Sequence, residues 1–141
     1  MKQTIIFYPL ISMVFLTFFI GIKMLTARIK AVKKDNMNPA FFALNRGAKQ
    51  PDYLIKVSQH YENLFELPLL FYTVIILIYI SNNVDLFYLS LSILFVLARY
   101  IHAFIHITYN RLSHRKYAFL IGTIFLFILW VRFFYQIIMS S

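Results

Sequence analysis

The chain has 141 residues, of which 61% are hydrophobic and 13% charged. A soluble domain normally carries about a quarter charged residues, so this composition indicates an integral membrane protein. The absence of cysteine excludes disulfides, thiolate nucleophiles and cysteine metal sites. The net charge of +9 does not indicate nucleic-acid binding, because the basic residues lie mostly in two loops, as membrane topology requires.

Four apolar segments predict an all-α bundle of four transmembrane helices that forms a single domain over residues 1–141. In chain order they cover about residues 5–25, 57–80, 86–107 and 117–138, and each is long enough to cross a bilayer. Lys2 precedes the first segment as in a signal peptide, but the segment is long and lacks a small-x-small cleavage site. We therefore expect a retained span.

The connections between the segments predict the orientation. Loop 1, residues 26–52, and loop 3, residues 110–116, carry the excess of basic residues: Arg28, Lys30, Lys33, Lys34, Arg46, Lys49, Arg111, Arg115 and Lys116. Loop 2, residues 81–85, has one acid and no base. The positive-inside rule then predicts a multi-pass protein of the cell inner (cytoplasmic) membrane, with loops 1 and 3 cytoplasmic and both termini outside.

Two of the segments carry a narrow polar stripe. On a helix of 100° per residue, four polar residues of the second segment fall within about 80° of arc, namely Lys56, Gln59, Asn63 and Glu66. Four of the third segment do the same, namely Arg99, His102, His106 and Asn110. Polar and charged residues inside a membrane mark functional sites by default.

Glu66 and Arg99 lie at similar distances from the outer ends of their spans, roughly 20 Å deep at about 1.5 Å per residue. Isolated charges at that depth are unfavourable by at least a few kcal/mol each. We therefore predict an ion pair between Glu66 and Arg99. Such a pair also fits a purely structural role that fixes the register of the two helices.

Pro68 and the histidines can each be explained by a structural role. Pro68 leaves the carbonyl of Leu64 without its helical donor and is expected to kink the second span. His102 and His106 have the i, i+4 spacing of a metal-binding pair, but no acid or third histidine accompanies them on that helix. We expect hydrogen-bonding histidines and no metal.

The ordered set of polar motifs resembles the MAPEG family (membrane-associated proteins in eicosanoid and glutathione metabolism). The pattern Asn63-x-x-Glu66 is followed by a proline, ARYIH stands at 98–102, and Arg115 lies sixteen residues after Arg99. The strings NLFELPLLFY and RYIHAFIHITYNRLSHR look most like an uncharacterised bacterial branch of that family. The resemblance covers nearly the whole chain.

The resemblance implies a homotrimer that binds glutathione at its subunit interfaces, near the cytoplasmic side, with no metal. Arg115 matches the catalytic arginine that stabilises the glutathione thiolate. The thiolate would attack small hydrophobic electrophiles dissolved in membrane lipid. A guanidinium beside sulfur lowers the pKa of the thiol. The positions that match glutathione-contacting or site-shaping residues are Arg28, Asn63, Glu66 and His102, and His106 is expected in the same site, at a position that differs from the family.

The sequence also departs from the active relatives. The departures are Gln59 and Glu62 where an arginine is common, His106 where a tyrosine is common, and Phe119 where an aromatic hydroxyl is common. They favour an alternative, a non-catalytic trimeric scaffold or lipid-binding protein. A third interpretation is a small proton or solute carrier that uses the polar seam, although four spans without inverted repeats argue against it.

Overall fold

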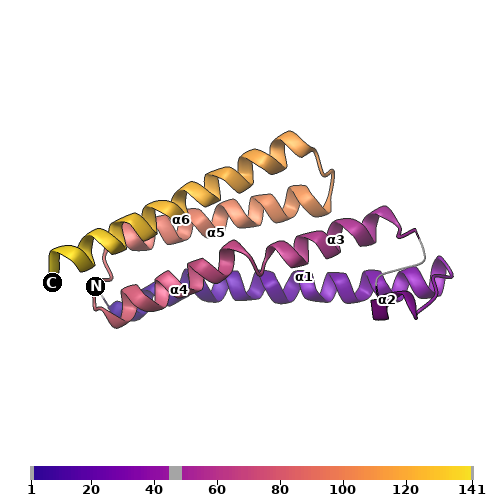
Figure 1. The fold of residues 1–141 in the computed structure, drawn as a ribbon, viewed down its shortest axis with the longest axis horizontal. Helices are drawn as coiled ribbons and strands as arrows, with labels where there is room; N and C mark the ends of the chain where they lie inside the picture. Colours follow the sequence, from indigo (N-terminus) through magenta and orange to yellow (C-terminus); the bar gives the residue numbers. More distant parts are fainter. Residues whose placement is uncertain (1, 45–48, 141) are drawn as a thin grey trace.

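The computed structural model describes residues 2–44 and 49–140, so Arg46 lies outside the described residues. A 3₁₀ turn at Gln3–Ile6 leads into a bundle of helices (Figure 1). The helices are α1 (Phe7–Lys34), α2 (Phe41–Leu44), α3 (Asp52–Asn63), α4 (Leu67–Ile80), α5 (Leu86–Ile107) and α6 (Leu112–Ser140). No strand occurs in the described ranges, and the predicted all-α class is confirmed.

Within those ranges, four helical segments are long and apolar enough to cross a membrane: Gln3–Lys34, Asp52–Ile80, Leu86–Ile107 and Leu112–Met139. They run alternately up and down, so both termini lie at one end of the bundle, here called the termini end (Figure 1). The turn between α5 and α6, the end of α1 and the start of α3 lie at the other end, here called the basic end. The multi-pass membrane architecture predicted from composition is confirmed.

Asparagines terminate three of the helices. Asn36, Asn82 and Asn110 have φ of 52°, 55° and 49°, a left-handed conformation that asparagine tolerates better than most side chains. The reversed backbone lets the next N–H groups reach carbonyls of the last turn, as when Met37 N donates to Ala31 O at 3.1 Å. The left-handed asparagines and their neighbouring hydrogen bonds therefore end these three helices.

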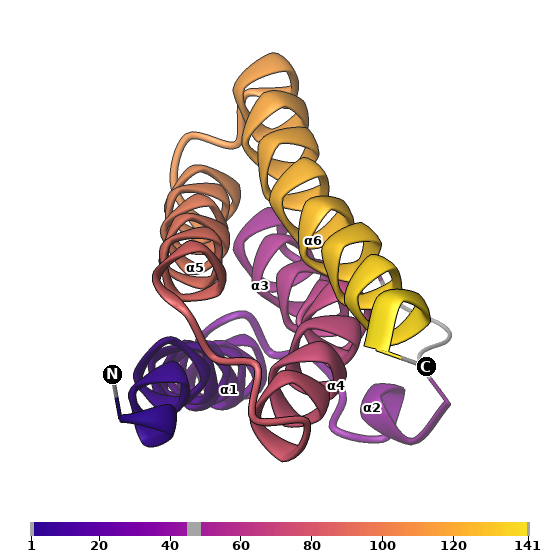
Figure 2. The ribbon, with the colours of Figure 1, turned by 90° about the vertical axis from the view of Figure 1, so that its left-hand side faces the viewer.

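The core lies between the helices, and the outer surface is apolar. α5 and α6 share the most extensive contact, and Phe71 of α4 stacks on Phe95 of α5 with ring centroids 4.5 Å apart. Figure 2 shows α3 and α4 between α1 and α6. Large apolar side chains such as Phe15, Phe18 and Phe127 are exposed, which is the surface that a bundle presents to lipid.

The second span is divided into two helices rather than kinked within one. α3 ends at Asn63 and α4 begins at Leu67. Pro68 has no N–H for the carbonyl of Leu64 and its ring clashes with that carbonyl, whereas proline is tolerated in the first turn of a new helix. Glu66, at φ −93° and ψ −98°, lies outside both helices. The expected polar stripe therefore holds on α3 as far as Asn63 and does not include Glu66.

Two predicted loop boundaries are also corrected. α1 continues to Lys34, because residues 26–34 are mostly good helix formers and Lys33 and Lys34 suit the negative end of the helix dipole. α6 begins at Leu112. As a result, Arg28 and Arg115 are helical residues rather than loop residues.

Candidate functional site

The break in the second span is held by a buried arginine. The Arg99 side chain of α5 is fully buried, and its Nη2 donates to the carbonyl of Asn63 at 3.2 Å. That carbonyl lies at the end of α3, where helical carbonyls lack N–H partners. Arg99 therefore caps α3 from a neighbouring helix, and its guanidinium also lies 5.4 Å from the centroid of the Phe119 ring on α6.

Glu66 interacts electrostatically with Arg99 but is far more exposed than the arginine. Its side chain is exposed at the break, and no ion pair within 4.0 Å joins it to Arg99 in this structure. The arginine uses a backbone carbonyl as its acceptor instead. The Glu66–Arg99 pairing stays a prediction.

Three histidines from two helices form a buried cluster. His60 of α3 and His102 and His106 of α5 are at most 2% exposed. The centroid of the His60 ring lies 5.3 Å from that of His102 and 5.1 Å from that of His106. Both ring nitrogens of His60, and Nδ1 of His102 and of His106, have no hydrogen-bond partner within the described protein. Buried polar atoms normally have a hydrogen-bond partner, so these unpaired nitrogens mark the cluster as unusual.

Sequence reasoning missed His60. The spacing of His102 and His106 was visible because both lie on one helix, whereas His60 joins them only through the packing of α3 against α5. Its position directly after Gln59 on the polar segment was the only signal. No group of three or more histidine, aspartate or glutamate side chains in the described ranges is placed to hold a metal ion.

Arg115 lies in the first turn of α6, at the basic end. Its Nη1 donates to Oδ1 of Asn110 at 3.0 Å, and Asn110 is the left-handed residue of the α5–α6 turn. Arg115 is also close enough to interact electrostatically with all three clustered histidines. Since a helix N-terminus carries partial positive charge, this corner of the bundle favours an anion.

The predicted site residues therefore fall into two sets. The structure brings together Asn63, Arg99, His102, His106 and Arg115, with Phe119 against the His102 ring at a centroid distance of 5.7 Å. Glu66 reaches this set only through its electrostatic interaction with Arg99, and Arg28 lies elsewhere. The Arg28 guanidinium lies 5.3 Å from the centroid of Phe42, on α2.

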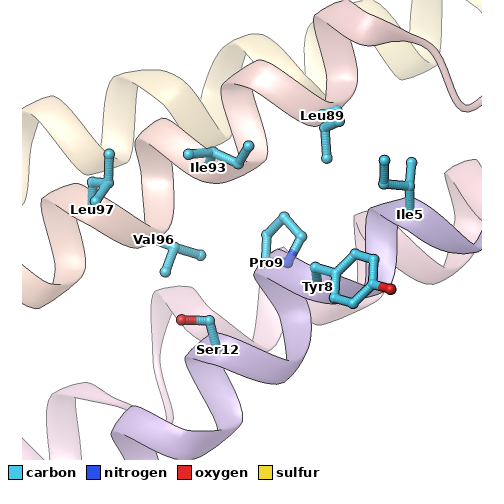
Figure 3. Close-up of a pocket in the computed structure, with 8 residues that line it drawn as sticks. All are labelled: Ile5, Tyr8, Pro9, Ser12, Leu89, Ile93, Val96 and Leu97. Carbon is cyan, nitrogen blue, oxygen red and sulfur yellow. The ribbon is translucent and has the colours of Figure 1, made fainter.

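Two of the apolar grooves that run along the bundle lie on α4 and α6 and between α1 and α5. One, of about 450 Å³, starts beside the break at Leu67 and follows α4 and α6, lined by Leu67, Leu70, Thr123, Leu126, Phe127, Trp130 and Phe134. The other, of about 360 Å³, lies between α1 and α5 (Figure 3) and is lined by Ile5, Tyr8, Pro9, Ser12, Leu89, Ile93, Val96 and Leu97. No charged side chain lines either groove, so each suits an apolar molecule rather than an anion.

Comparison with known proteins gives one match. The family model of the MAPEG family matches residues 6–135, nearly the whole chain. No curated protein and no solved structure matches the chain. The matched region includes both the helix break and the histidine cluster.

Proposed function

Because the chain belongs to the MAPEG family, we propose that it is a homotrimeric glutathione transferase or peroxidase of the inner membrane that acts on hydrophobic electrophiles. The observation that carries the proposal is that Arg115, at the basic end, the buried histidines and Arg99, at the break after α3, follow one another along the inside of the bundle. Positive side chains and unpaired polar groups thus lie between the basic end and the break, where an apolar groove begins at Leu67.

The chemistry follows from the charges. Glutathione is a net anion, so the positive potential around Arg99 and Arg115 favours its binding. The Arg115 guanidinium beside the sulfur stabilises the thiolate over the thiol and so lowers the pKa of the thiol. The thiolate then attacks an electrophilic carbon, and the leaving group departs with its bonding electron pair as the carbon–sulfur bond forms. With a hydroperoxide, the thiolate instead breaks the O–O bond, which gives glutathione sulfenic acid and an alcohol. A second glutathione then reduces the sulfenic acid to glutathione disulfide and water.

The α4–α6 groove is the proposed place for the electrophile. It begins at Leu67, directly after Glu66, and its lining is apolar as far as Trp130 and Phe134. A molecule dissolved in the bilayer reaches it without crossing water. In a trimer, Arg28 and the exposed Glu66 would complete the glutathione site across the subunit interface.

Binding and thiolate formation provide the test. Calorimetry of the purified protein with glutathione, followed by the ultraviolet absorbance of the thiolate, should show binding and a thiolate signal. Arg115→Ala should lose the thiolate signal, whereas Arg111→Ala, an exposed arginine of the same turn, should keep it. Native mass spectrometry tests the trimer. No binding at millimolar glutathione would rule out the enzymatic function and leave the fold unaffected.

A non-catalytic scaffold is the second candidate, and one contact favours it. Phe119, which replaces an expected hydroxyl, packs against both Arg99 and His102, so an apolar ring occupies a position where a polar group would contact a ligand. A scaffold keeps its cellular function in the Arg115→Ala variant, whereas an enzyme loses it.

A further inference from the structure

A pocket at the basic end has a lining that shares no residue with the histidine cluster. It has a volume of about 330 Å³ and is formed by α1, α3 and α5. Its residues include Lys23, Lys30, Tyr53, Val57, Ile107 and Thr108. Basic side chains thus border one part of the pocket, and apolar side chains form another.

The positive charge of this pocket is not neutralised by its own lining. Lys23 and Lys30 lie two turns apart on one face of α1, and no carboxylate belongs to the pocket lining within the described ranges. The Lys30 ammonium lies 4.3 Å from the centroid of Tyr53, so an aromatic ring supports it rather than an anion. Neither lysine forms an ion pair within 4.0 Å in the part of the chain that the structure describes.

A third lysine lies at the rim. Lys56 Nζ donates to the carbonyl of Thr108, just past the end of α5, at 3.4 Å. The carboxylate close by belongs to Asp35, and it accepts a hydrogen bond from the Tyr53 hydroxyl at 2.6 Å. The three lysine ammonium groups outnumber the single carboxylate of Asp35, so the rim has a net positive charge.

We propose that this pocket binds the phosphate group of an anionic glycerophospholipid. Lysine ammonium groups act as point charges that suit a phosphate, and basic pockets between transmembrane helices are suited to lipid headgroups. The pocket lies at the end of the spans, where headgroups are found, and Val57 and Ile107 supply an apolar wall for the start of an acyl chain. The inference does not depend on glutathione chemistry.

The test compares lipids and lysines. The midpoint of thermal unfolding in detergent is measured with phosphatidylglycerol, phosphatidylcholine or inorganic phosphate, and native mass spectrometry counts and ranks bound lipid. Phosphatidylglycerol should stabilise the unmodified protein more than the other two. In the Lys23→Gln/Lys30→Gln variant its affinity should fall roughly fivefold per lysine, or about 25-fold in all.

The matched control is Lys33→Gln/Lys34→Gln, which removes the same charge from exposed positions of the same helix outside the pocket. It should keep most of the affinity. Equal losses in both double variants would mean general surface attraction and would overturn the proposal. Equal stabilisation of the unmodified protein by inorganic phosphate would mean a free-anion site and would overturn the lipid assignment, even if the variants failed to fold. Arg115→Ala should leave lipid binding unchanged, which separates this site from the glutathione site.

Discussion

Asp85 has two structural roles at the termini end of the bundle. Its carboxylate accepts the N–H of Tyr88 at 2.9 Å and so caps α5, and it forms a two-pronged ion pair with Arg132 of α6. The Arg132 guanidinium also lies over the rings of Phe87 and Tyr88. One acidic residue thus joins loop 2, the start of α5 and the end of α6.

This arrangement predicts a pH-dependent stability. Partial burial raises the pKa of Asp85, but the hydrogen bonds from Arg132 and the Tyr88 N–H outweigh burial and lower it overall. A lowered pKa in the folded state adds stability that is present above the unfolded value of about 3.9 and is lost as the pH falls through the folded pKa. Asp85→Asn should lose up to about 1 kcal/mol at pH 7, since the pair is partly exposed.

The measurement is unfolding in detergent between pH 3 and pH 7. The difference between the unmodified protein and Asp85→Asn should shrink as the pH falls. Glu62→Gln, which alters an exposed carboxylate outside this contact and away from any helix N-terminus, is the control and should show no such decline. A difference that stays constant across the range would mean that the ion pair does not contribute.

A double-mutant cycle tests the predicted ion pair between Glu66 and Arg99. Arg99 already has the Asn63 carbonyl as an acceptor, so a Glu66 pairing must appear as coupling beyond that bond. If the two charges interact, Glu66→Gln and Arg99→Leu should give non-additive losses of stability, with a coupling of about 0.2–1 kcal/mol for a partly exposed pair. Additive losses would show that Arg99 acts through the α3 terminus alone.

At the scale of the elements, Gly122 marks the close approach of α5 and α6. A Cβ added there would lie 3.4 Å from Ala98 Cβ and 3.7 Å from Arg99 Cδ, which are ordinary contacts. Gly122→Ala should therefore stabilise the helix by about 0.5–1 kcal/mol. Gly122→Leu should lower stability by about 1–3 kcal/mol, because larger side chains overpack the interface.

Chemical or thermal unfolding of both variants checks this prediction, with Gly21 as the comparison. A Cβ at Gly21 would lie 3.3 Å from Tyr61 Cε2, a tighter contact, so Gly21→Ala should gain less than Gly122→Ala. An unchanged free energy of unfolding in Gly122→Leu would contradict a close approach of α5 and α6 at this position.

The elements also show what the sequence can and cannot predict. Apolar runs were sufficient for the all-α class and the four spans, since span length depends on bilayer thickness alone. The consequence of Pro68 was foreseen as a kink but not as two helices with Glu66 between them. His60 joined the histidine cluster through contacts between helices, which spacing along one helix does not encode.

At the scale of the whole molecule, the charge distribution predicts the orientation of the protein in the membrane, which cysteine labelling can test. The basic loops should face the cytoplasm, and loop 2 and both termini should face outward. The chain has no cysteine, so any single introduced cysteine is a unique label site. Asn83→Cys in loop 2 and Ser113→Cys at the start of α6 probe opposite ends of the bundle.

Intact cells are treated with a membrane-impermeant maleimide, and the labelling of each variant is compared before and after permeabilisation. Asn83→Cys should react in intact cells, and Ser113→Cys should react only after permeabilisation. The cysteine-free parent protein is the background control. The reverse pattern would place the basic corner with Arg115 and the lysine pocket outside the cytoplasm. Reduced glutathione would then have to be supplied from the outer side of the membrane. The lipid headgroup in the lysine pocket would have to belong to the outer leaflet.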